Sequence, residues 1–159
     1  MTRAWLGARE AEERARLGDP TGALRALERA RTTFERAEGD DRVWTHFFDR
    51  GRLDGLTVAT HVMLGQPRAA QLASASALRL LGSSPTKKRA LILSNVASSL
   101  IQQREAGEAC RLATDALAIV VHTEFAMGLA RLRRVRQQLT PWESTGAVRD
   151  FDEQLRAVA

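Results

Sequence analysis

The sequence contains no tyrosine, only one cysteine, and no long uninterrupted apolar segment. A single cysteine, Cys110, excludes an internal disulfide and a thiolate metal site, and it favours a reducing, cytoplasmic setting. The N-terminal residues from Arg3 to Arg16 are too charged for a signal peptide, and no segment predicts a membrane span. Aromatic residues make up only 5% of the chain, while alanine and leucine recur throughout. This composition favours packed helices over β-sheets.

Lysine is also scarce, because Lys87 and Lys88 are the only two, and arginine supplies almost all of the net charge of +5. Acidic residues are interleaved with the arginines, so the charge pattern predicts a mixed, solvated surface and no direct nucleic-acid binding. The strongest candidate site for nucleic acid or an acidic partner is one arginine run. It is expected near a helix C-terminus, where cations are favoured in any case, and a solvated face is the preferred interpretation. The run comprises Arg131, Arg133, Arg134 and Arg136.

Turn signals divide the 159 residues into apolar-periodic stretches of helical length. Gly18-Asp19-Pro20 and Gly65-Gln66-Pro67 are two such signals, and Ser83-Ser84-Pro85 and Thr140-Pro141 are two others. We expect one all-α domain over residues 1–159, with short loops joining antiparallel neighbours and with its third helix the longest. The eight expected helices lie near residues 3–17, 21–37, 43–64, 67–81, 86–103, 107–121, 123–139 and 144–157.

Small residues recur seven positions apart on three of the expected helices. Residues seven apart share one helix face, and alanines there allow a paired helix to approach closely. Each set begins five residues after a candidate turn residue, namely Gly18, Gly65 or Arg104. The pattern predicts stacked helical hairpins over about 3–37, 43–81 and 86–121, with a capping pair over 123–157. The sets are Ala23/Leu27/Ala30, Ala70/Ser74/Ala77 and Ala109/Ala113/Ala116.

These features resemble the tetratricopeptide repeat (TPR) family, whose second helix carries A-x3-F and a further alanine. Leu17-Gly18-Asp19-Pro20 and Leu64-Gly65-Gln66-Pro67 resemble the family's inter-helix turn, although the tryptophan, glycine and tyrosine of its first helix are not in register. The resemblance implies a short TPR-like α-solenoid that binds a protein or peptide.

A narrower resemblance is to the C-terminal TPR-like domains of actinobacterial helix-turn-helix transcriptional regulators. It rests on Trp44-x2-Phe47-Phe48-Asp49-x3-Leu53-x-Gly55, Leu64-Gly65-x-Pro67, Glu108-Ala109-Cys110-Arg111-Leu112-Ala113, Arg131-Leu132-Arg133-Arg134 and Pro141-Trp142. In those regulators a DNA-binding domain precedes the TPR-like part, which senses a ligand or partner. The first helix here is too acidic for a recognition helix, so we expect either a fragment or a standalone member.

The TPR resemblance implies a concave groove lined by the first helices of successive pairs, here the third and fifth helices. On the fifth helix Asn95, Ser98 and Gln102 form a polar stripe, for which a groove face and a solvated surface are equally good interpretations. Core packing is the preferred interpretation of Trp44 and Phe48, and a helix start is the alternative to a groove role for Asp49. A carboxylate clamp is not expected, because only Asn95 fits that pattern. The expected groove residues are His46, Asp49, Arg52, Leu56, Ala59, Met63, Asn95, Ser98 and Gln102.

No catalytic or metal-binding pattern is present. His46, His61 and His122 lack ligand spacing, and no nucleophile has a credible base, so we expect no enzyme activity, metal or cofactor. The sequence favours a regulatory or adaptor module for a protein or peptide ligand. The alternatives are a sensor fragment of a regulator, or self-association through Leu129, Leu132 and Val135. A small-molecule enzyme is the least favoured interpretation.

Overall fold

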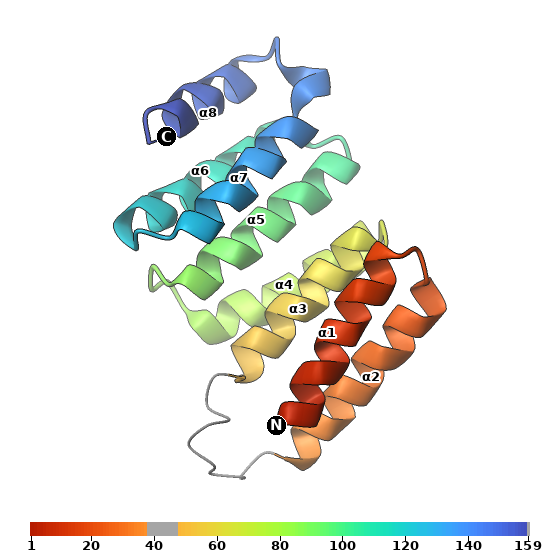
Figure 1. Ribbon diagram of the computed structural model, residues 1–159. Coiled ribbons are helices and arrows are strands. Elements are labelled where there is room, and N and C mark those ends of the chain that lie inside the picture. The colour runs from red at the N-terminus through yellow and green to blue at the C-terminus, as the bar shows by residue number, and fades with distance from the viewer. Residues whose placement is uncertain (38–47, 159) are drawn as a thin grey trace. The chain divides into compact units, whose positions relative to one another are not determined.

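The computed structural model describes residues 1–37 and 48–158, and over these ranges it is all-α, with eight α-helices, one short 3-10 helix and no strand (Figure 1). The chain divides into two compact units, Met1–Ala77 and Leu78–Ala159. The helices are α1 (Thr2–Arg16), α2 (Pro20–Arg36), α3 (Arg50–Met63), α4 (Pro67–Leu81), α5 (Lys87–Gln102), α6 (Ala106–His122), α7 (Ala126–Gln138) and α8 (Gly146–Arg156), with the 3-10 helix η2 (Thr140–Trp142) before α8.

The number and order of the helices confirm the prediction, but the expected third helix is wrong in its start and its length. Phe48 and Asp49 precede α3, which begins at Arg50 and has 14 residues, fewer than the 17 of α2. The physical reason is an N-cap: the Asp49 carboxylate accepts a hydrogen bond from the Arg52 amide at 2.9 Å. The earlier part of the expected helix lies outside the described residues.

The helices are joined by a recurring tight turn. After α1, the Gly18 amide donates to the Ala15 carbonyl and the Asp19 amide to the Arg14 carbonyl, which is the Schellman arrangement. The same pair of bonds follows α3, α5 and α6, with a residue at positive φ in the place of Gly18. The three turn residues predicted from the sequence are therefore confirmed. The residues at this position are Gly18, Gly65, Arg104 and Glu124.

The small residues on the second helices pack as predicted. All three sets, on α2, α4 and α6, are buried, with exposed fractions from 0% to 3%. Close approach is clearest between α1 and α2, where a Cβ added to Gly7 would lie 3.3 Å from the Cβ of Ala30. These alanines bring the paired helices together, which is why the alanine pattern identified the hairpins.

Unit 1 has its main core between α1, α2 and the start of α3. Phe34 and Phe48 meet edge to face, with ring centroids 5.9 Å apart and an interplanar angle of 79°. Leu53 packs into the same cluster, which confirms core packing for Phe48. Val58 and Val62 form a second cluster with α4. Trp44 lies outside the described residues.

Unit 2 is built from α5 to α8. In it α5 packs against α6 and α7, whereas α8 packs mainly against α6 and less against α7. α8 contributes Val148, Phe151 and Leu155 to the core. Leu132 and Val135 on α7 are also buried, at 0% and 1% exposure, so the expectation that they form an exposed surface for self-association is wrong. Their spacing marks the face of α7 that packs inward.

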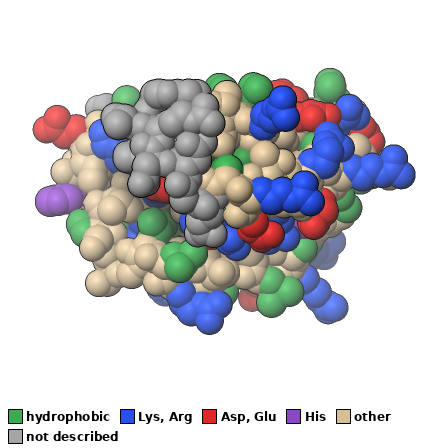
Figure 2. Space-filling model, turned by 90° about the horizontal axis from the view of Figure 1, so that it is seen from below, with side chains coloured by type: hydrophobic (Ala, Val, Ile, Leu, Met, Phe, Trp, Pro, Cys, Tyr) green, Lys and Arg blue, Asp and Glu red, His purple; other side chains and the backbone are tan. Residues whose placement is uncertain are grey.

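Charged side chains of both signs lie close together on the surface (Figure 2). In unit 1 the Glu10 carboxylate accepts hydrogen bonds from Arg14 at 2.8 Å and from Arg29 on α2 at 3.0 Å. Arg14 also donates to Asp19 at 2.8 Å. These contacts pair much of the basic charge with acidic groups. None of the helices in the described ranges is long and apolar enough to cross a membrane.

Candidate functional site

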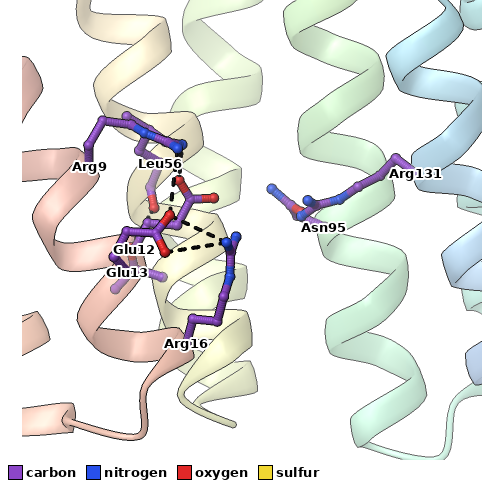
Figure 3. Close-up of polar contacts among 8 residues, drawn as sticks. Arg9, Glu12, Glu13, Arg16, Leu56, Asn95 and Arg131 are labelled. Atoms are coloured by element: carbon purple, nitrogen blue, oxygen red, sulfur yellow. Dashed lines mark hydrogen bonds and ion pairs between the residues drawn. The ribbon is translucent and has the colours of Figure 1, made fainter.

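The most distinctive polar contact in unit 2 joins α5 and α7. The Arg131 guanidinium on α7 donates to the side-chain oxygen of Asn95 on α5, and the two side chains point toward one another (Figure 3). Asn95 is buried, at 3% exposure, and Arg131 is half-buried. The contact is charge-assisted, because the donor is a guanidinium, and such bonds are stronger than those between neutral groups.

The other expected groove residues of α5 differ in exposure. Ser98, three residues after Asn95, is 6% exposed, whereas Gln102 at the end of the helix is exposed. The solvated-surface interpretation is therefore wrong for Asn95 and Ser98. That interpretation fits only Gln102, at the end of the polar stripe.

In unit 1, α3 carries five of the expected groove residues, counting Asp49 at its N-cap. Asp49 is exposed, and its carboxylate caps the helix, which confirms the helix-start alternative. Arg52 is exposed, Leu56 is half-buried against the main core of the unit, and Ala59 is 5% exposed. Met63 is half-buried. Their role in a groove stays a prediction, and His46 lies outside the described residues.

A buried carboxylate was not anticipated from the sequence. Asp54 on α3 is 4% exposed, and one of its oxygens accepts from Arg50 Nε at 3.2 Å. The other oxygen, Oδ2, is buried and has no hydrogen-bond partner in the described part of the chain. Burial raises the pKa of this carboxyl group above its ordinary value, and the neighbouring Arg50 and Arg31 charges oppose the rise.

The first helix of unit 1, α1, also carries a charged ladder. Arg9 pairs with Glu12 and, at 3.6 Å, with Glu13, and Arg16 donates to Glu13 at 3.3 Å (Figure 3). Glu12 is buried, at 7% exposure, although glutamate is rarely buried without a partner. Arg9 supplies that partner, so the ladder is explained by pairing within one helix.

The arginine run of α7 serves two different structural roles. Arg131 meets Asn95, and Arg136 Nε donates to the Asp152 carboxylate of α8 at 2.8 Å. Arg133 and Arg134 are exposed, as a solvated face predicts. Two of the four arginines therefore tie α7 to its neighbouring helices.

The sequence signal that could have identified Arg131 was its spacing. It follows Asn95 by 36 residues, close to the 34-residue period of TPR arrays. That relation was missed because the four arginines were interpreted as one surface group. The alanine sets lie only on α2, α4 and α6, so they could not be used to align α7 with α5.

The other chemically reactive side chains of residues 1–37 and 48–158 form no recognisable site. Cys110 is buried, and burial raises the pKa of its thiol, which makes it a poor nucleophile. His61 Nδ1 lies 2.9 Å from the Gln66 side-chain oxygen, and His122 is exposed. In the described ranges, no group of three or more His, Cys, Asp and Glu residues is arranged to hold a metal ion.

Comparisons with known proteins leave the resemblance to the TPR family as a prediction. The chain matches no family model, and comparisons with curated proteins and with solved structures also find no match.

Proposed function

We propose that the chain is a TPR-like α-solenoid module of the cytoplasm that binds a protein or peptide and acts as a regulator or adaptor. The single observation that carries the proposal is the contact between Asn95 and Arg131. It joins α5 and α7. In the proposed array these are the first helices of successive pairs, and first helices line the ligand groove in TPR arrays. The proposal assigns the chain no catalytic role.

The chemistry of this pair suits an extended peptide. A guanidinium carries five N–H donors, and an Asn amide offers both donors and an acceptor. Asn95 is 3% exposed, so its part is to hold the guanidinium in place, and the half-buried Arg131 is the member of the pair that a ligand would contact. The exposed Gln102 on α5 would add a polar contact.

The experiment is a selection of peptides from a random display library on the whole chain, followed by affinity measurement on the best binder. Gln102→Ala removes an exposed side chain and should leave stability within about 0.5 kcal/mol of the parent. If Gln102 contacts the ligand, the same change weakens binding by about fivefold, the effect of a contact worth 1 kcal/mol.

The matched control is Arg111→Ala, an exposed position on the second helix α6. Arg111 pairs only with exposed acidic residues of its own helix, Glu108 and Asp115, so its loss should affect neither stability nor peptide affinity. Equal weakening by Gln102→Ala and Arg111→Ala, or no weakening by Gln102→Ala, would contradict the proposed groove.

A further inference from the structure

An apolar hollow of about 320 Å³ opens on unit 2, beside the turn between α6 and α7. Its volume lies at the low end of the range for small-molecule pockets, about 300–1,000 Å³, so it suits a short ligand. All but one of its lining residues are apolar, and the exception is Glu124. The apolar lining residues are Val120, Val121, Phe125, Ala126, Leu129 and Val158.

The walls of the hollow are held in place by packing. A Cβ added to Gly128 of α7 would lie 2.5 Å from the Phe125 ring and 2.6 Å from a Val120 methyl group, so this glycine lets both side chains rest against the helix backbone. The Lys87 ammonium lies 5.6 Å from the centroid of the Phe125 ring. The ring is therefore positioned by contacts from two helices besides its own turn.

Glu124 adds a negative charge to this apolar lining. Its side chain is exposed, and its carboxylate makes no hydrogen bond or ion pair with another residue in the described ranges. Its φ of 48° lies in the left-handed region, where the equivalent turns after α1 and α3 have Gly18 and Gly65 and the turn after α5 has Arg104. A non-glycine residue is disfavoured in that conformation. The turn itself gives no reason for a glutamate there.

We propose that this hollow binds a small amphipathic ammonium compound. Its alkyl chain lies against the valine, leucine and phenylalanine walls, and its ammonium group faces the Glu124 carboxylate. The apolar walls supply the affinity, because each buried methylene strengthens binding by about fourfold. Glu124 selects the cation over a neutral or anionic compound of the same length. Lys87 opposes that selection, because its positive charge lies 5.6 Å from the centroid of the Phe125 ring, which lines the hollow, and repels a bound cation.

In the test, the ¹⁵N-labelled whole chain is titrated with hexylammonium, hexanol and hexanoate. Binding is measured from the chemical shifts of the backbone amides. Hexylammonium should bind with a Kd on the order of 1 mM, the affinity reasonable for so few atoms. It should bind about two- to fivefold more tightly than hexanol, as an exposed charge pair allows, and hexanoate should bind least. The amides of residues 120–129 should move.

Charge variants separate selectivity from apolar binding. Glu124→Gln should remove the preference for hexylammonium and leave the affinity for hexanol unchanged. Lys87→Gln should increase that preference, because it removes the opposing charge. A preference that persists in Glu124→Gln, or tighter binding of hexanoate than of hexylammonium by the parent chain, overturns the proposal.

Two alanines of α7 give a matched pair for the hollow itself. Both are exposed, but Ala126 lines the hollow and Ala130 does not. Ala126→Trp should fill the hollow and abolish binding, whereas Ala130→Trp should bind as the parent does, with unfolding midpoints checked for both. Retained binding in Ala126→Trp, or shifts that cluster away from residues 120–129, also overturns the proposal.

Discussion

The contact between Asn95 and Arg131 makes the strongest quantitative prediction about this chain. Replacing Asn95 by alanine removes the acceptor of a charge-assisted hydrogen bond from a buried position. Hydrogen bonds to charged groups contribute about 1.5–3 kcal/mol, so we expect Asn95→Ala to lower the free energy of unfolding by about 2 kcal/mol. For a chain of this length, that corresponds to a Tm about 4–8 °C lower.

The two side chains should be strongly coupled. Arg131→Met keeps much of the length of the side chain but leaves the Asn95 oxygen without this donor. Each single change therefore removes the same hydrogen bond, and the double variant loses it only once. We expect the double variant to be more stable than the sum of the two single losses predicts, by about 1–2 kcal/mol.

Unfolding of unit 2 can be followed separately by fluorescence. Trp142 is the only tryptophan between Leu78 and Ala159, so a Trp5→Phe, Trp44→Phe background reports on that unit alone. Urea titrations of the parent, both single variants and the double variant complete the cycle. Gln102→Ala combined with Arg131→Met is the control pair, because Gln102 is exposed on the same helix.

Additivity within about 0.5 kcal/mol for Asn95→Ala and Arg131→Met would refute the reasoning, since independent sites add to that accuracy. A coupling of the same size in the Gln102 control would refute it as well. That result would assign the coupling to a general change in α5 and not to the hydrogen bond.

Three further changes test other parts of the fold by thermal unfolding. Replacing Arg104 or Glu124, whose φ values are 66° and 48°, by glycine should raise stability by about 0.5–1 kcal/mol. Gly18→Ala, at φ 75°, should lower stability by about 1 kcal/mol. Changes in stability of the opposite sign would contradict the turn geometry. Because burial raises the pKa of Asp54, ionisation of its carboxyl costs folded-state stability at neutral pH, so Asp54→Asn should raise the unfolding midpoint at pH 7. That gain should shrink as pH falls through the raised pKa toward the ordinary value of 3.8, and a gain independent of pH would disprove the cause. Asp49→Ala should cost about 1 kcal/mol through loss of the N-cap and Asp49→Asn much less; equal losses would point to a role of the charge beyond capping.

The sequence alone determined the local architecture of this chain. Helix-length periodicity and the Gly18 and Gly65 turns fixed the helices, because the chain must satisfy its backbone hydrogen bonds locally between turn signals. The alanine sets on α2, α4 and α6 identified the paired helices, since only small side chains allow so close an approach. Even Arg104 could be recognised as a turn residue, by its distance from Ala109.

The tertiary structure decided which polar residues are buried and with which partners. Asn95 and Ser98 look on a helical wheel like a solvated stripe, and Arg131 looks like one of several surface arginines. Their burial and pairing depend on how α5 and α7 meet, and single-helix periodicity carries no information about such contacts between helices. The α3 start was missed because Asp49 caps the helix instead of continuing it. The hollow beside Glu124 arises from several segments that meet in space, so no local pattern could have predicted it.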